Sequence, residues 1–131
     1  MAKRAKTRRT LEEILASTSD SLFPSELGDA VVSVDSSDCE GDTPLHIMVR
    51  RNDLYAVQEL IGAGANVNAV GDMGETALHI ATGQGNLGVI ELLMRSGANA
   101  ELRSEFNKTP FEIAMGKGGE VAKLLRRSRN A

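Results

Sequence analysis

The sequence predicts an all-α solenoid of stacked helix-turn-helix units, and three observations point to it. The motif Thr-Pro-Leu-His at Thr43 returns as Thr-Ala-Leu-His at Thr76 and, weakened, as Thr-Pro-Phe-Glu at Thr109, a step of 33 residues each time. Each motif is followed by two apolar runs with helical spacing. Glycines end the second run at Gly64 and Gly97, where a helix commonly stops. Such a period indicates units that cover their apolar faces only by stacking on one another.

The segment before the first unit, residues 10–33, does not carry the repeat. Thr10 and Glu13 form a possible capping box at the start of an apolar helix, and a loop containing Phe23 follows. An apolar helix and loop at this place can cover the exposed side of the first unit. We therefore predict an N-terminal cap at residues 10–33, preceded by a basic, disordered tail at residues 1–9.

The first two units, residues 34–66 and 67–99, follow one scheme. In the first, Thr43 can cap a helix with its hydroxyl group, and Pro44 suits the first helical position, where no N–H is needed. Asn52 and its neighbour break this helix before a second one begins. The predicted unit is a finger, a helix, a turn and a second helix.

The repeat resembles the ankyrin repeat. The resemblance covers about residues 34–128 and rests on the 33-residue step, on the motif at Thr43, and on Gly-Ala-Asn-Val-Asn-Ala at residues 64–69. Further columns keep the same step: Gly41 and Gly74; Ile47, Ile80 and Ile113; Leu60 and Leu93; Ala65 and Ala98; Asn66 and Asn99; Val34, Val67 and Ala100. The resemblance implies β-hairpin fingers that project from one edge of the stacked helix pairs, and a concave binding face.

Three departures from the pattern stand out. Gly71 replaces an acid at the start of the second finger, Asn107 replaces a turn glycine in the third, and Glu112 stands where the motif has histidine. We interpret the third unit, residues 100–131, as a degenerate C-terminal cap. Its last helix is expected to carry cations outward; they are Lys123, Arg126 and Arg127.

Charge is strongly segregated along the chain. The formal net charge is −3, but seventeen acids and five bases lie between residues 10 and 116, a local charge of about −12, while both ends are basic. The acidic body disfavours nucleic acid as a partner, because it would repel a phosphate backbone. The basic N-terminal run could still be a nuclear address or a phosphate contact, or only a solubilising tail. No apolar segment approaches the length of a membrane span, so we expect a cytoplasmic protein.

The histidines and the cysteine are the candidates for chemistry. His46 and His79 occupy the same column of successive units, where the resemblance implies a hydrogen bond to a finger rather than a metal ligand or a base. Cys39 lies seven residues before His46, and a thiol–imidazole pair can be nucleophilic, but the sequence supplies no third, orienting group. We therefore expect no enzyme activity, no metal and no cofactor.

The remaining surface is the predicted binding site. We expect the finger loops and the exposed sides of the first helices to contact a protein partner. Met73 and Phe106 lie in finger loops that should be wet, so each is a candidate anchor or else folds back onto the neighbouring finger. The full set of predicted partner-binding residues is Cys39, Glu40, Asp42, Arg50, Arg51, Asp72, Met73, Glu75, Gln84, Glu105, Phe106, Lys108 and Lys117.

The acids at the first two finger tips favour a basic partner. They are Asp35, Asp38, Glu40, Asp42, Asp72 and Glu75, and neither finger contains a Lys or Arg. A row of like charge raises the encounter rate with a partner of opposite charge. The leading prediction is a protein-protein interaction module. Two narrower alternatives are an immunity protein that inhibits a basic toxin such as a nuclease, by analogy with short bacterial ankyrin proteins, and a regulatory adaptor whose basic ends make a second contact.

Overall fold

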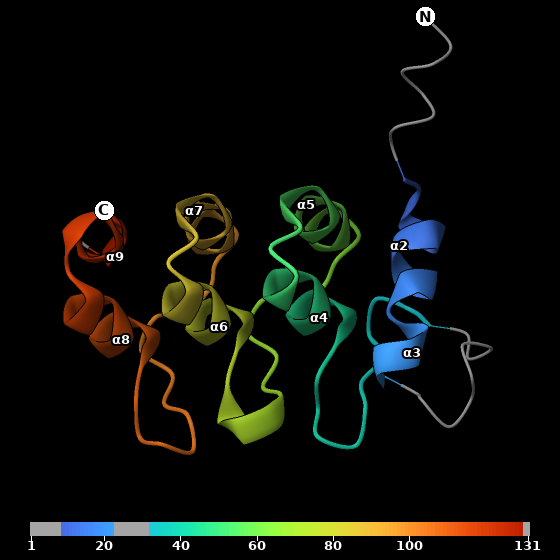
Figure 1. The fold of residues 1–131 in the computed structure, drawn as a ribbon, viewed down its shortest axis with the longest axis horizontal. Helices are drawn as coiled ribbons and strands as arrows, with labels where there is room; N and C mark the ends of the chain where they lie inside the picture. The colour runs from blue at the N-terminus through green and yellow to red at the C-terminus, as the bar shows by residue number, and fades with distance from the viewer. Residues whose placement is uncertain (1–8, 23–31, 130–131) are drawn as a thin grey trace, which may run out of the picture.

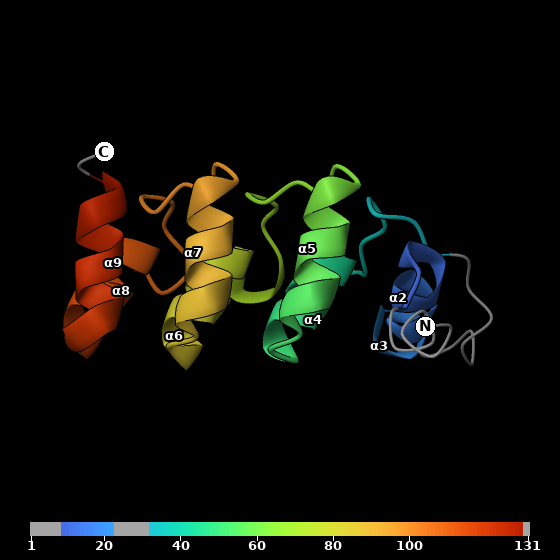
Figure 2. The ribbon, with the colours of Figure 1, turned by 90° about the horizontal axis from the view of Figure 1, so that it is seen from above.

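The computed structural model describes residues 9–22 and 32–129, and these form a row of helix pairs (Figure 1). The elements in chain order are α2 (Leu11–Ser17), α3 (Ser19–Leu22), α4 (Pro44–Arg50), α5 (Leu54–Gly62), the short 3-10 helix η2 (Asp72–Gly74), α6 (Ala77–Gln84), α7 (Leu87–Arg95), α8 (Pro110–Lys117) and α9 (Gly119–Arg129). Helices α4, α6 and α8 line up in one layer, and α5, α7 and α9 in the other, as Figures 1 and 2 show. The predicted all-α stack is confirmed.

Each first helix begins with a capping box, as the repeated motif predicts. The threonines at 43, 76 and 109 accept a hydrogen bond from the backbone N–H three residues on, and the side chain of that third residue accepts one from the threonine N–H. Both bonds satisfy N–H groups that a helix start would otherwise leave without a partner. Asp53 and Asn86 cap the second helices α5 and α7 in the same way with their side-chain oxygens.

The core lies between the two helix layers and continues from one unit to the next. Helices α4, α6 and α8 pack side by side, as do α5, α7 and α9, and each first helix packs on the second helix of its own unit. The largest fully buried apolar side chains are Ile14, Leu45, Met48, Leu60, Leu78, Ile90, Leu93, Leu125, Val49 and Val57. The core is aliphatic, in keeping with the 3% aromatic content of the chain.

The three fingers project from the same edge of the stack (Figure 1) and are closed by equivalent hydrogen bonds. A backbone hydrogen bond closes each finger, from Asp38 to Asp42, from Gly71 to Glu75 and from Ser104 to Lys108, again in steps of 33 residues. The fingers therefore close as hairpins do, but residues 9–22 and 32–129 contain no strand. The arms are too short to form a ladder of several pairs, so the finger is a tight turn rather than a two-stranded ribbon.

The described part of the segment predicted to be an N-terminal cap packs against the first unit. Ile14 and Leu15 are buried, α2 packs against α5, and the predicted Thr10–Glu13 capping box forms. Arg9, which the sequence assigns to the disordered tail, instead donates to both carboxylate oxygens of Asp53 at 2.7 and 2.8 Å. The structured part of the chain thus begins no later than Arg9.

Some predictions lie outside the described residues or concern the chain as a whole. The tail at residues 1–8 and the loop residue Phe23 are not among the described residues. In the described parts of the chain, no helix is both long enough and apolar enough to span a membrane.

Candidate partner-binding face

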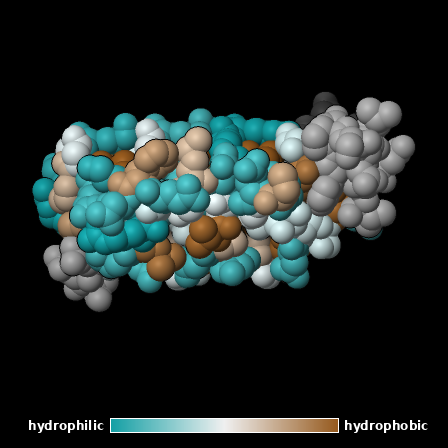
Figure 3. Space-filling model, turned by 90° about the horizontal axis from the view of Figure 1, so that it is seen from below, coloured by the Kyte–Doolittle hydropathy of each residue, from teal (hydrophilic) through white to brown (hydrophobic). Residues whose placement is uncertain are grey.

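The finger tips, defined from here on as residues 39–41, 72–74 and 105–107, consist of residues that are all exposed or half-buried. Figure 3 views the molecule from the finger side and shows separate apolar side chains on a mostly hydrophilic surface. Two of the exposed large apolar side chains are finger-tip residues, Met73 with 48% exposed and Phe106 with 62% exposed. Each was predicted either to be an anchor or to fold back onto the neighbouring finger, and about half or more of each side chain is exposed.

The second finger tip has an unusual backbone. Met73 has φ = 61° and ψ = 19°, in the left-handed region that non-glycine residues rarely adopt, and the next residue, Gly74, also has a positive φ. The tip is tied to the third finger, because the Glu105 N–H donates to the Met73 carbonyl oxygen at 3.0 Å. A bulky residue held in this conformation at an exposed tip is the kind of outlier that occurs at binding sites.

Asp42 was predicted to face the partner, but the structure turns it inward. It is buried, with 6% exposed. Its Oδ2 accepts from Arg50 at 2.7 Å and its Oδ1 accepts from the Asp72 N–H at 3.0 Å, so the carboxylate joins the first finger to the second. Burial raises the pKa of Asp42, but the hydrogen bonds from Arg50 and Asp72 and the Arg50 charge outweigh it and hold the pKa below its usual value. Arg50 therefore compensates one member of the acidic row.

The position of Asp42 also explains Gly71. A Cβ atom at residue 71 would collide with the Asp42 Oδ1 and would stand 2.9 Å from the Nε2 atom of His46. The acid expected at the start of a finger is present in the first one, where Asp38 accepts from the N–H groups of Glu40 and Asp42. In the second finger the carboxylate of Asp42 occupies that space, so residue 71 has no side chain.

Two further predicted contact residues make bonds within the protein. Arg51 donates to Ser17 and Ser21 in the N-terminal cap. Gln84 donates to the carbonyl oxygen of Arg50 at 3.0 Å, across the ends of α4 and α6. Both side chains remain exposed, but their amide and guanidinium groups connect structural elements of the stack.

The two histidines cap their own helices and bind the next finger. The Nδ1 of His46 accepts from the Thr43 N–H at 3.1 Å, so the proton is on Nε2, which donates to the Glu75 carbonyl oxygen at 3.0 Å. His79 makes the equivalent pair of bonds, to the N–H of Thr76 and the carbonyl oxygen of Lys108. Burial lowers the pKa of His46, which favours this neutral form.

The structure gives no support to the alternative that Cys39 and His46 form a nucleophilic pair. Both nitrogens of the His46 ring are engaged in the bonds just described, and Cys39 is exposed at the first finger tip. Within the described residues, no three side chains of the His, Cys, Asp and Glu types gather as metal ligands would.

The other predicted contact residues remain on the surface. They are Cys39, Glu40, Asp72, Met73, Glu75, Glu105, Phe106, Lys108 and Lys117, all exposed or half-buried. The acids among them form no ion pair with another described residue. This edge therefore combines two apolar side chains with uncompensated carboxylates.

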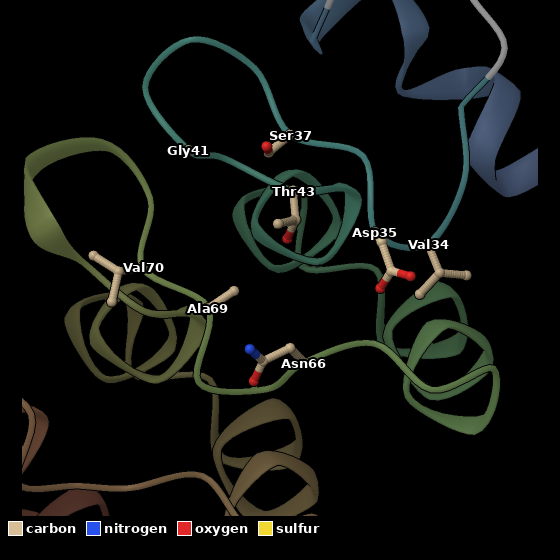
Figure 4. Close-up of a pocket in the computed structure, with 8 residues that line it drawn as sticks. All are labelled: Val34, Asp35, Ser37, Gly41, Thr43, Asn66, Ala69 and Val70. Carbon is tan, nitrogen blue, oxygen red and sulfur yellow. The ribbon is translucent and has the colours of Figure 1, made fainter.

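Two residues near the fingers were not among the predicted contact residues. Val70 is 57% exposed, the largest fraction for an apolar side chain after Phe106. It lines a pocket between the first finger and the loop that begins the second unit, together with Asp35 (Figure 4). Residues 35 and 68 occupy equivalent positions of successive repeats. The change from Asp35 to Asn68 is the difference in the sequence that could have pointed to this place.

Comparison with known families agrees with this architecture. A family model described as ankyrin repeats, in three copies, matches residues 10–104 and 45–131. The first matched span begins inside the segment predicted to be the N-terminal cap. Comparison with curated proteins gives no match.

Proposed function

We propose that this chain, which belongs to the ankyrin-repeat family, binds a protein with a basic surface through its finger tips. Ankyrin repeats generally mediate protein-protein interaction. The observation that carries the proposal is the exposed pair Met73 and Phe106 on two fingers whose backbones are hydrogen-bonded to each other. Apolar anchors on a rigid support lose little conformational freedom on binding, so their burial contributes effectively to affinity.

The charge of the partner follows from the acids around these anchors. Glu40, Asp72, Glu75 and Glu105 lie on the same edge without an ion pair to another described residue. A basic partner would neutralise them on contact and would be attracted before contact. An acidic partner would bury like charges against one another, which disfavours it.

The first experiment removes the two anchors together. We expect the variant Met73→Ser/Phe106→Ser to bind the partner at least tenfold more weakly, because a tenfold change corresponds to about 1.4 kcal/mol and each anchor buries a large apolar side chain. The partner is first isolated by affinity capture with the wild-type protein and its affinity is then measured by calorimetry. The matched control is Leu87→Ser, which removes a similarly exposed apolar side chain, 40% exposed, from the start of α7.

A second variant tests the charge. Asp72→Lys/Glu75→Lys reverses two carboxylates of the second finger and should slow association, with a smaller effect at high salt because salt screens exposed charges. Equal affinity of the wild type and this variant would contradict the basic-partner part of the proposal. Equal affinity of the wild type and the anchor variant would contradict the finger-tip site.

The narrower roles are distinguished by the N-terminal tail. An adaptor whose basic ends make a second contact should lose affinity when residues 1–8 are deleted, and an inhibitor that binds through the finger tips alone should not. The deletion stops before Arg9, because Arg9 holds the cap through Asp53. An inhibitor of a basic nuclease would also abolish the activity of its target in the complex.

A further inference from the structure

The two joints between successive repeats differ at several side chains, and one of these differences changes a hydrogen-bonded bridge. Between the second and third repeats, Asn68 bridges to the next loop: its Oδ1 accepts from the Asn99 N–H at 2.8 Å and its Nδ2 donates to the Gly97 carbonyl oxygen at 3.3 Å. This bridge needs one acceptor and one donor on the same side chain, which the amide group provides.

Between the first and second repeats the equivalent residue is Asp35. Its carboxylate can only accept hydrogen bonds, so it cannot donate to the carbonyl oxygen of Gly64, the counterpart of Gly97. An oxygen brought close to that carbonyl oxygen would be repelled. Accordingly, Asp35 makes no such bridge and forms no ion pair with any residue in the described part of the chain.

The unbridged joint contains a pocket of about 300 Å³ (Figure 4). Val34 and Asp35 contribute to it from the start of the first finger, and Asn66, Ala69 and Val70 from the loop that begins the second repeat. In the close-up these side chains surround the space between the two loops. The pocket is therefore apolar along part of its wall and carries one carboxylate.

This combination suits one kind of group. The hydrocarbon stem of a Lys or Arg side chain packs well against methyl groups, while its charged head keeps a polar partner. Asp35 would supply that partner as a charge-assisted hydrogen-bond acceptor. An anionic group is disfavoured by the same carboxylate, and a purely apolar group would leave the carboxylate desolvated and unpaired.

We propose that the pocket at Asp35 receives one Lys or Arg side chain of the protein partner. This inference rests on the proposed function and adds a specific contact to it. The exposed Val70 becomes covered when the stem of the basic side chain enters. At the second joint the counterparts of Asp35, Ala69 and Val70 are Asn68, Leu102 and Arg103, so the two joints present different side chains at this place.

The test removes the charge of the pocket. In the variant Asp35→Asn, the new amide can bridge Gly64 and Asn66 as Asn68 bridges Gly97 and Asn99, and the pocket keeps no carboxylate to pair with a cation. The matched control is Glu91→Gln, which removes the same charge from an exposed position on α7. Both variants are expected to unfold at a denaturant concentration no lower than that of the wild type.

The probe is N-acetyl-arginine amide, followed by the amide resonances of Ala69 and Val70 in NMR titrations. We expect saturable shifts for the wild type and for Glu91→Gln, and at least tenfold weaker binding for Asp35→Asn. N-acetyl-norleucine amide, a neutral probe with a hydrocarbon stem, should give no saturable shifts. Equal responses of the wild type and Asp35→Asn, or of the two probes, would overturn the inference.

The partner provides the second readout. The isolated partner should bind Asp35→Asn at least tenfold more weakly than it binds Glu91→Gln. If Asp35→Asn binds the partner as the wild type does, the pocket inference fails while the finger-tip proposal stands. If instead the variant Met73→Ser/Phe106→Ser retains full affinity, the finger-tip proposal fails, and the probe titration still decides whether the pocket accepts a cation.

Discussion

The second and third repeats have the same helix pair and the same finger, yet they differ wherever the second touches its successor. Column by column, Ile90 and Leu93 of the second repeat are buried in the core, whereas the third has the exposed cations Lys123 and Arg126. Helix α9 instead buries a stripe that includes Leu125. Among the described residues no unit packs on the far side of the third repeat, so these columns lie against solvent there and accept charge.

The glycine in the turn of the second finger shows the same dependence on a neighbouring repeat. Gly74 has φ = 70°, and a Cβ atom there would stand 2.8 Å from the Glu105 backbone nitrogen of the next finger. Asn107 holds the same turn position with φ = 60° and has an exposed side chain, because no further finger among the described residues approaches it. The left-handed turn alone accepts asparagine, and the close neighbour is what requires glycine.

The residue that completes the capping box differs between the two repeats for the same reason. His79 closes its own capping box with Nδ1 and donates from Nε2 to the Lys108 carbonyl oxygen of the third finger. Glu112 closes the same box, since its Oε1 accepts from the Thr109 N–H at 3.1 Å, but it has no donor for a next finger. Glutamate thus keeps the capping bond within the repeat but cannot donate a hydrogen bond to a neighbouring finger.

The largest effect is expected from exchanging the core columns. Leu93→Arg should lower the free energy of unfolding by at least about 4 kcal/mol, because it places an unpaired charge in a fully buried site. Urea unfolding followed by circular dichroism measures it. The reverse change, Arg126→Leu, should alter stability by less than about 0.5 kcal/mol. Similar costs for the two changes would contradict the comparison.

A smaller loss should follow from exchanging the cap residues. His79→Glu keeps the capping box but removes the donor to Lys108 and sets a buried carboxylate against a carbonyl oxygen, at a cost of about 3 kcal/mol. Glu112→His should stay within about 0.5 kcal/mol, because residue 112 is exposed. The measurement is again the urea midpoint, and a tolerated His79→Glu would show that the bond to Lys108 has no role in stacking.

The turn column should give the next effect. Gly74→Asn must move the third finger away from a contact of 2.8 Å, and we expect it to cost about 2 kcal/mol. Asn107→Gly should change stability by less than about 1 kcal/mol, since both residues tolerate the left-handed conformation. Hydrogen exchange at Glu105 provides a local readout, and unchanged protection in Gly74→Asn would sink the explanation.

The smallest effect on stability is expected from a change in pH. It distinguishes the first two repeats from the third, since only the first two have histidine. Burial lowers the pKa of His46 below its ordinary value of about 6.5, so the unfolded chain binds the proton more readily. The stability from the neutral ring is therefore complete above pH about 6.5 and declines as the pH falls toward the folded pKa. His46→Gln should flatten the decline in urea midpoint between pH 7 and 5.

Glu112 should respond in a separate, more acidic range. The hydrogen bond from the Thr109 N–H lowers the pKa of Glu112, so its contribution is complete above the ordinary value of about 4.3 and disappears as the pH falls through the folded pKa. The urea midpoint as a function of pH measures this. If Glu112→Gln removed a decline in stability above pH 5, the assignment of His46 to the higher pH range and Glu112 to the more acidic range would be wrong.

Much of the fold could be predicted from residues that act locally. The threonine caps, Pro44 and the helix-ending glycines depend on bonds within a few residues, so the sequence reveals them directly. The exposure of Met73 and Phe106 was also predictable, because apolar residues in polar finger loops have no place in the core. The β-strands that the resemblance implies for the fingers do not form among the described residues, because one backbone hydrogen bond closes each finger without a ladder.

The candidate site was predictable only in part, because partners distant in sequence decide which charges remain free. Asp42 binds the N–H of Asp72, 30 positions away, and Arg9 binds Asp53, 44 positions away. In the sequence both resemble ordinary surface charges. The 33-residue step and the starts of the first helices follow from the sequence alone, because propensities and capping act within one turn of helix. Only the tertiary structure placed Asp42 inside and left Asp35 at an open joint, because hydrogen bonds between neighbouring fingers depend on their approach in space.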